Sequence, residues 1–315
     1  MPRAAACLLF LALALAAAPA EPSLDFIHLT DTHVIDDTGI AMPIAVARMH
    51  FFESGKRLAA FLPATRQHAP AFFLVTGDLI DAFRMQAADG GFREGQVEAF
   101  RKAVDGSPAP LYLALGNHDI CEYGIKDGKL TVGQAAEAAR AAWSRQFACF
   151  RRGTYYGFTR RVGRASYRFL VLEAAGAAAI TPEQARWIRR QIASRGNAAV
   201  ILAMHFPLAA NPVSDSIREA AGGGGVVLAL SGHVHQNGIA ETPFGAKSIV
   251  QVRTAAFGYG DENWRKVRLR EDRIEIFAPG PSESVEKTIA LPAAQPAASS
   301  DSRRAPSRAA SISAR

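Results

Sequence analysis

The sequence of 315 residues lacks the features of a fibrous, repetitive or multi-span membrane protein. Its 26 glycines and 17 prolines follow no fixed period, and no apolar run after the first 20 residues approaches membrane-spanning length. Heptads and repeats of roughly 20–50 residues are absent as well. These absences exclude a collagen-like fibre, a coiled coil and a solenoid. With 49% hydrophobic and 21% charged residues, the chain can bury a sizeable core, which excludes disorder throughout.

Acidic residues are slightly scarce, since 29 Asp and Glu stand against 36 Lys and Arg, a formal net charge of +7. Arg3 contributes one of these charges, and residues 292–315 contribute three through four arginines and Asp301. Residues 21–291 are therefore only mildly basic, at +3, and their Lys and Arg residues are scattered. This distribution argues against a stable nucleic-acid partner, because such proteins concentrate basic residues in one patch.

The two ends of the chain differ in composition from the middle. Arg3, the apolar stretch 7–17 and the Ala-Pro-Ala at 18–20 have the layout of a secretory signal peptide. We therefore expect cleavage after residue 20 and a periplasmic or secreted product. An uncleaved anchor is the alternative, but the apolar stretch is shorter than the ~20 residues that span a bilayer. Residues 292–315 are rich in Ala, Ser, Pro and Arg, and we expect a disordered tail there.

Cysteine usage is compatible with export and leaves the redox state open. Cys7 lies in the signal segment, so only Cys121 and Cys149 remain. In an oxidising compartment these two thiols can pair, but their sequence spacing does not show that they lie within bridging distance. Neither has the Cys or His neighbour of a zinc motif.

Residues 21–291 alternate short apolar runs with amphipathic stretches, which predicts one α/β domain. The strongest helix signal covers residues 181–194, where Thr181 is a candidate N-cap, Pro182 suits the first turn and Gln184 completes a capping box. Further helices are expected over residues 55–62, 94–104 and 132–147. A β-hairpin is expected from residues 264–269 and 273–277.

Polar side chains of metal-ligand type follow five of the apolar runs. In an α/β sheet, residues just after parallel strands lie at the carboxyl edge, where ligands bind. We therefore expect the five segments to converge on one site. In chain order they are Asp31-Thr32-His33, Gly77-Asp78-Leu79-Ile80-Asp81, Gly116-Asn117-His118-Asp119, Met204-His205 and Gly232-His233-Val234-His235.

The ligand-type side chains in these segments are Asp, Asn and His, without a thiolate. This donor set suits Zn, Mn or Fe ions, and it exceeds the four ligands that one tetrahedral ion takes. Two ions about 3.5–4 Å apart and bridged by a carboxylate would use all of them, and such a pair stabilises the attacking and leaving oxygens in displacement at phosphorus. The pattern therefore predicts hydrolysis of a phosphate ester.

In this order, the five segments resemble the motifs of the calcineurin-like metallophosphoesterase superfamily. They read Asp-x-His, Gly-Asp-x-x-Asp, Gly-Asn-His-Asp, a single His and Gly-His-x-His, and they span residues 31–235, about two thirds of the chain. The resemblance implies a four-layered α/β/β/α sandwich with two facing mixed sheets. It also implies a dinuclear centre in which a hydroxide held between two metal ions attacks phosphorus.

The resemblance further assigns a role to each motif residue. His118 would face the leaving oxygen as proton donor or electrostatic stabiliser, with Asp81 orienting its ring. Asp119 would lie behind the ligands. Seven residues would hold metal: Asp31, His33 and His235 for one ion, Asn117, His205 and His233 for the other, and Asp78 bridging the two. The identity of the ions, among Mn, Fe and Zn, stays open.

Two branches of the superfamily differ from this chain at specific positions. Purple acid phosphatases carry Tyr where this chain has Asp81, so their coloured tyrosine–iron centre is not expected. Serine/threonine protein phosphatases place Arg soon after the second motif and end the third in Glu, whereas this chain has Ala82-Phe83-Arg84 and Asp119. Protein phosphatase activity is therefore not expected. Phosphodiesterases and phosphomonoesterases share the motif set, and we favour a phosphodiester.

Substrate recognition is expected from residues 34–49 and 82–96, because loops on a rigid scaffold carry specificity. In the second loop Arg84 and Arg93 are candidates to grip a phosphate group, with Arg84 preferred, although arginines of this kind are more often solvated surface residues. The expected partner is a small phosphorylated substrate, and the oligomeric state stays open. A metal-binding scaffold without turnover and a nuclease are the alternatives; the complete motif set disfavours the first and the weak basicity the second.

Overall fold

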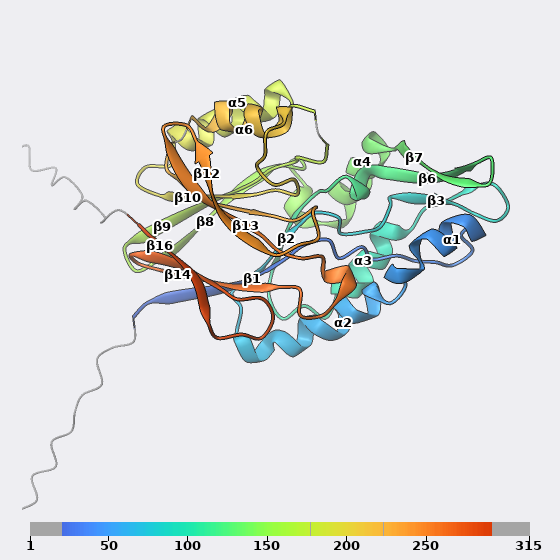
Figure 1. Cartoon of the computed structure of the whole chain (residues 1–315), viewed down its shortest axis with the longest axis horizontal. Coiled ribbons are helices and arrows are strands. Elements are labelled where there is room, and N and C mark those ends of the chain that lie inside the picture. The colour runs from blue at the N-terminus through green and yellow to red at the C-terminus, as the bar shows by residue number, and fades with distance from the viewer. Residues whose placement is uncertain (1–20, 177, 223, 292–315) are drawn as a thin grey trace, which may run out of the picture.

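The computed structural model describes residues 21–176, 178–222 and 224–291, and the account that follows concerns this part of the chain. The expected signal segment and tail lie outside it. The α/β fold class is confirmed, since the chain forms mixed β-sheets with helices packed against them (Figure 1).

The first six-stranded sheet carries the strands that precede three of the motifs. Its order is β16-β15-β14-β1-β2-β5, in which β1, β2 and β5 run parallel and the other three are antiparallel to their neighbours. The expected hairpin is confirmed as β14 and β15. The bounds are β1 Ser23–Leu29, β2 Phe73–Thr76, β5 Leu111–Ala114, β14 Arg265–Arg270, β15 Arg273–Phe277 and β16 Val285–Ala290.

The second six-stranded sheet carries the strands that precede the last two motifs. Its order is β12-β13-β11-β10-β9-β8, with four parallel strands in the centre and an antiparallel strand at each edge. The bounds are β8 Tyr156–Val162, β9 Ala165–Val171, β10 Ala199–Ala203, β11 Val226–Ser231, β12 Gly238–Phe244 and β13 Lys247–Arg253.

Three apolar clusters hold the layers together. Phe26 of the first sheet and Phe72, just before β2, pack against Phe169 of the second sheet, in a cluster that lies between the two sheets. Helices α2 (Ser54–Ala64), α3 (Gln96–Val104) and α4 (Ala136–Gln146) pack on the first sheet. Helices α5 (Pro182–Ala193) and α6 (Pro212–Ala221) pack on the second. The contacts therefore run from helices through two sheets to helices (Figure 1).

A third, four-stranded sheet was not expected. Its order is β4-β3-β6-β7, and with α1 (Met42–Arg48) it lies at the end of the molecule opposite β16 (Figure 1). The expected helix over 132–147 is wrong at its start, because residues up to Gln134 belong to β7. Asp127 and Gly128 between β6 and β7 both have positive φ, as a two-residue hairpin turn requires. The bounds are β3 Arg84–Gln86, β4 Phe92–Arg93, β6 Cys121–Lys126 and β7 Lys129–Gln134.

The remaining helical segments are single 3₁₀ turns: η1 Met49–Phe51, η2 Thr65–His68, η3 His118–Ile120, η4 Ala148–Phe150 and η5 Phe257–Tyr259. The helix expected at 181–194 forms as α5, and the Thr181 side chain caps it by accepting from the Gln184 N–H at 3.2 Å. The other half of the capping box does not form, since the Gln184 amide binds the main chain of Glu173 instead.

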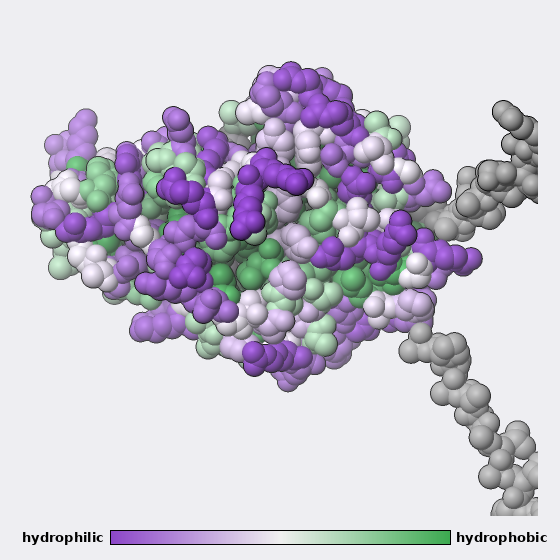
Figure 2. Space-filling view, turned by 180° about the vertical axis from the view of Figure 1, so that it is seen from behind, coloured by the Kyte–Doolittle hydropathy of each residue, from purple (hydrophilic) through white to green (hydrophobic). Residues whose placement is uncertain are grey.

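Cys121 and Cys149 are both free thiols in the described part of the chain. Figure 2 shows one face of the molecule, on which hydrophilic side chains cover most of the area and hydrophobic ones form smaller groups. None of the described helices combines the length and the apolar composition needed to cross a membrane.

Candidate metal centre

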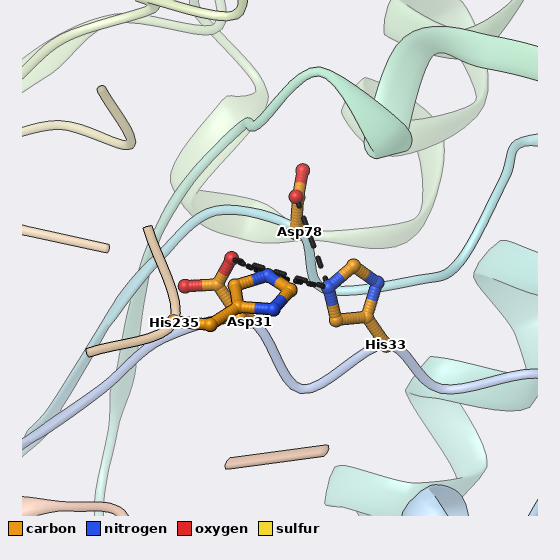
Figure 3. A group of neighbouring side chains, drawn as sticks. All are labelled: Asp31, His33, Asp78 and His235. Atoms are coloured by element: carbon orange, nitrogen blue, oxygen red, sulfur yellow. Dashed lines mark hydrogen bonds and ion pairs between the residues drawn. The ribbon is translucent and has the colours of Figure 1, made fainter. Parts of the chain in front are cut away.

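The five motif segments meet at the carboxyl ends of the central strands of both sheets. The first three follow β1, β2 and β5, and the last two follow β10 and β11. In Figure 3 the carboxylates of Asp31 and Asp78 point toward the imidazoles of His33 and His235. The structure therefore confirms that the five motif segments converge on one site.

The first ligand group consists of Asp31, His33, Asp78 and His235, whose donor atoms all lie within 4.8 Å of one another. Oδ1 of Asp31 lies 3.1 Å from Nε2 of His235. Nε2 of His33 lies 3.3 Å from Nε2 of His235 and 3.9 Å from Oδ2 of Asp78. Three of these residues are buried, and His235 is partly open to solvent.

The second ligand group consists of Asp78, His205 and His233, with Asn117 beside them. Nε2 of His205 lies 3.1 Å from Oδ2 of Asp78, 3.1 Å from Oδ1 of Asn117 and 3.2 Å from Nδ1 of His233. Asp78 belongs to both groups, which is the position that a bridging carboxylate requires.

The backbone at these residues is unusual, because five of the seven expected ligands have positive φ. Residues other than glycine rarely adopt this left-handed backbone conformation, which costs roughly 1–3 kcal/mol per residue. It persists only where contacts with the surrounding structure enforce it. The φ angles are 51° at Asp31, 44° at His33, 49° at Asp78, 69° at His233 and 55° at His235. The fold therefore holds these loops against their local preference, with the side chains aimed at one point.

Two motif glycines allow the loops to approach one another this closely. A Cβ at Gly116 would clash with the main chain and carboxylate of Asp78, and one at Gly232 would clash with the side chains of Thr30 and Asp31. In place of a side chain, the loop beyond Gly232 brings the N–H of His233 to 3.0 Å from Oδ2 of Asp31. Glycine at these positions therefore sets the spacing of the ligands.

The electrostatics of the cluster favour positive charge at its centre. Burial raises the pKa of the Asp31 and Asp78 carboxyl groups, but the surrounding imidazoles lower it more, so both groups stay ionised. Burial lowers the pKa of His205, but the Asp78 carboxylate raises it more, to about 9. A positive charge at Nε2 of His205 is therefore stabilised by the adjacent carboxylate.

The residues present fit a pair of metal ions. Oδ1 of Asp31 is buried and accepts no hydrogen bond from the described residues. His205 donates from Nδ1 to the carbonyl oxygen of Thr76 at 3.0 Å, which turns Nε2 toward the acceptor oxygens of Asp78 and Asn117. A cation among these lone pairs satisfies them all, and a thiol-free set of oxygen and imidazole donors suits Mn, Fe or Zn.

The imidazole planes of the ligands are fixed by aromatic and polar neighbours. Phe51 stacks on His33 with ring centroids 4.2 Å apart, and Phe206 stacks on His233 at 3.9 Å. Oδ1 of Asp81 lies 3.2 Å from Nδ1 of His33. Of the three residues that orient these imidazoles, Asp81 belongs to a motif, whereas Phe51 and Phe206 do not.

Asp81 orients the ring of His118, as expected, but through its main-chain carbonyl and not through its carboxylate. That carboxylate faces His33 and is bound by Arg48, whose Nε donates to Oδ2 at 2.8 Å. The ring of His118 is held at Nδ1 by the main-chain carbonyl of Asp81 at 2.7 Å and by the hydroxyl of Tyr123 at 2.8 Å. Nε2 of His118 lies 3.9 Å from Oδ2 of Asp78, at the edge of the ligand groups.

Arg84, the expected substrate-binding residue, lies on β3 and pairs with Glu122 on β6, with Nε 2.7 Å from Oε2. Arg93 pairs with Asp89 at 2.7 Å on the surface. Both arginines pair with carboxylates of the four-stranded sheet and its loop. Arg48, in the other segment expected to carry specificity, binds the Asp81 carboxylate beside His33.

Asp119 lies behind the ligands, as expected. Its buried carboxylate accepts from the N–H groups of Leu79 at 2.8 Å, Ile80 at 3.0 Å and Gly116 at 2.6 Å. It therefore ties the second motif to the third and fixes the loops that carry Asp78 and Asn117.

Comparison with known proteins agrees with this arrangement. Residues 24–237 match a family model described as calcineurin-like phosphoesterase. No curated protein sequence matches the chain. A dimetal phosphatase from Danio rerio has a similar structure, with a TM-score of 0.59 at 13% identity, over 86% of this chain and 100% of that one. A purple acid phosphatase from yellow lupin, Lupinus luteus, gives a TM-score of 0.54 at 12% identity, over 85% of this chain and 53% of that one. At these identities the likeness is one of fold.

Proposed function

Because this chain belongs to the calcineurin-like phosphoesterase family, and is thereby a phosphoric ester hydrolase, we propose that it hydrolyses a small phosphodiester at the two ligand groups joined by Asp78. The observation that carries the proposal is the position of that carboxylate. It lies in both groups, one completed by Asp31, His33 and His235 and the other by His205 and His233.

The two ligand groups supply negatively charged oxygens for two cations. Asp31 and Asp78 each carry a negative charge, whereas the imidazoles bind metal in their neutral form. When bound, a metal pair supplies Lewis acidity and a hydroxide nucleophile at neutral pH. Asn117 adds an amide oxygen to the second group.

The role of His118 follows from its position. Its Nδ1 is occupied by two oxygens, and its side chain is 22% exposed, with Nε2 beside the ligand groups. We assign to Nε2 the transfer of a proton to the leaving oxygen, because this atom lies beside the ligand groups. The donating form is the doubly protonated ring, which keeps its Nδ1 proton and becomes neutral when Nε2 gives up the other. A phosphodiester is preferred over a monoester because the chain lacks the Tyr and the Arg that mark two phosphatase branches, although phosphomonoesterases share the motif set itself.

The proposed reaction is tested by stripping the purified protein of metal and reloading it with Mn, Fe or Zn. Turnover is measured with p-nitrophenyl phosphate and bis-p-nitrophenyl phosphate. Asp78→Asn removes the shared carboxylate, and we expect it to abolish metal-dependent turnover. Asp127→Asn is the matched control, because it makes the same change in an exposed turn where Asn is tolerated. Faster turnover of the diester supports the preferred substrate class. Bound metal with no turnover of either ester favours a scaffold without activity.

We also propose that the protein is exported and acts in the periplasm or outside the cell. The N-terminal charge, apolar stretch and Ala-Pro-Ala sequence support this location. Fractionation of cells that express the full chain, compared with cells that express it without residues 2–20, tests the proposal. Recovery of both forms in the cytoplasm would contradict it.

A further inference from the structure

Tyr123 lies outside every motif, yet its hydroxyl reaches the proposed proton donor. It stands on β6 of the four-stranded sheet, where its side chain is buried with 2% exposure. Its Oη lies 2.8 Å from Nδ1 of His118, and the carbonyl oxygen of Asp81 lies 2.7 Å from the same nitrogen. Two oxygens from different elements therefore meet on one ring atom.

The chemistry of these oxygens determines where the ring carries its proton. A carbonyl oxygen can only accept, so the contact with Asp81 requires a proton on Nδ1. The Tyr123 oxygen lies on the same N–H and accepts from it as well. Nε2 is then the ring atom left to exchange a proton with a substrate.

The carboxylate that could have oriented this ring is engaged elsewhere. Asp81 is bound by Arg48 through Nε at 2.8 Å and lies 3.2 Å from Nδ1 of His33. The same guanidinium lies 5.5 Å from the centroid of the Tyr123 ring. Arg48 therefore holds the carboxylate on His33 and packs against the tyrosine that reaches His118.

We propose that Tyr123 is the positioning residue for His118, and that its hydroxyl fixes the imidazole with Nε2 aimed at the leaving oxygen. This inference rests on the proposed hydrolysis for its kinetic consequence and on the hydrogen bonds for its structural one. The aromatic ring of Tyr123 packs in an apolar cluster with Ile44, Phe51 and Met85. Tyr123→Phe therefore keeps the packing and removes only the hydroxyl.

The kinetic test compares esters whose leaving groups differ in basicity. p-Nitrophenolate leaves without a proton, whereas phenolate is about as basic as the tyrosine side chain and gains from proton transfer. For Tyr123→Phe we expect kcat to fall about tenfold with phenyl phosphate and diphenyl phosphate, and to change little with the p-nitrophenyl esters. KM should stay the same, because the hydroxyl does not reach the phosphoryl group. An equal loss for both leaving groups, or no loss for either, would overturn the proposal.

Two comparisons separate this role from a general effect of losing a buried hydroxyl. Tyr156→Phe is the matched control, since the Tyr156 hydroxyl is also tied in hydrogen bonds, to the main chain of Leu113 at 2.8 and 3.0 Å. We expect it to leave the leaving-group dependence unchanged. In a His118→Ala background, Tyr123→Phe should have no further effect on kcat, and an additive loss there would contradict a role through His118.

A measurement on the metal-free protein keeps the inference separate from the proposed reaction. Long-range ¹H–¹⁵N NMR spectra report which ring nitrogen of His118 carries the proton and whether that proton is protected. We expect a protected Nδ1–H in the native chain and in Tyr156→Phe, and faster exchange of the same proton in Tyr123→Phe. An unchanged His118 signal in Tyr123→Phe would overturn the inference, whether or not the protein hydrolyses esters.

Discussion

Arg48 holds the carboxylate of Asp81 through two hydrogen bonds, from Nε to Oδ2 and from Nη2 to Oδ1. The carboxylate is fully buried, and Arg48 is 20% exposed. Burial raises the pKa of Asp81, but the guanidinium lowers it more, to about 2. A charge that the fold buries beside His33, an expected metal ligand, thus depends on an arginine 33 residues earlier in the chain.

Replacing that arginine should destabilise the protein. Arg48→Met keeps most of the side-chain volume but leaves the Asp81 charge without its partner, so we expect a loss of about 2–4 kcal/mol in the free energy of unfolding. Urea denaturation measures it. Arg101→Met is the control, because Arg101 forms an exposed pair with Glu98 and should cost under about 1 kcal/mol. An equal loss in the free energy of unfolding for the two variants would show that the buried pair stabilises the protein no more than an exposed pair.

The carboxylate of Asp119 should be needed for stability and for turnover together. It accepts three main-chain N–H groups, and Asp119→Asn replaces one acceptor oxygen by an amide nitrogen that cannot accept. We expect a loss of about 1–3 kcal/mol in the free energy of unfolding and lower activity, since the loops of Asp78 and Asn117 lose their common anchor. Asp105→Asn, on the exposed end of α3, should change neither. Wild-type stability of Asp119→Asn would contradict the anchoring role.

The two ligand groups should be separable by metal content. His235→Ala removes a donor from the first group only, and His233→Ala from the second only, so each variant should retain about one ion per chain after dialysis. Asp78→Asn should weaken both. Elemental analysis of the dialysed proteins measures this. Two retained ions in His235→Ala and in His233→Ala would show that the ions are held by other residues.

Buried His28 should make the protein sensitive to acid. Its ring lies between the hydroxyls of Thr76 at 2.8 Å and Thr254 at 2.9 Å, and burial, reinforced by Arg265, lowers its pKa from 6.5 to about 3. Because the unfolded chain binds this proton and the folded one does not, stability is full above pH 6.5 and falls as the pH drops toward 3. The slope approaches roughly 1.4 kcal/mol per pH unit.

His28→Asn tests this by removing the titrating ring while keeping a polar side chain. The variant should be less stable at pH 7, because the fit between the two threonines is lost, but its free energy of unfolding should fall less steeply between pH 6 and pH 4. Urea titrations at several pH values give both slopes. Parallel curves for the two proteins would assign the acid sensitivity to other groups.

Most residues of the site were predictable because each motif can be identified from a short stretch of sequence. Each motif follows an apolar run, and the strand pairing that joins β1, β2 and β5, or β10 and β11, places the ends of those runs together. The rest depended on pairing between distant segments. β3 and β4 have only three and two residues, too few to show alternation. They form because β3 pairs with β6 and β4 pairs with β3. The Asp-Gly pair at 127–128 is typical of a hairpin turn and indicates β6 and β7. The residues after it also fit an amphipathic helix, which is why β7 was not predicted.

The positions of Arg48 and Tyr123 could not be predicted in the same way. Neither follows a strand that ends at the site, and each reaches it from the lobe formed by α1 and the four-stranded sheet. Asp81 also shows why a motif position alone does not fix a role. The main-chain carbonyl of Asp81 contacts His118, whereas its carboxylate is bound by Arg48, which lies outside the motifs.

Each ligand group also draws on both six-stranded sheets. Asp31, His33 and Asp78 follow strands of the first sheet, whereas His205, His233 and His235 follow strands of the second. A bound ion therefore links the two sheets, in addition to the apolar packing and the hydrogen bonds between them. A partly unfolded form that keeps its strands but lets the sheets separate must release its ions. The number of ions bound per chain therefore reports whether the two sheets are packed together, and it can be measured without any substrate.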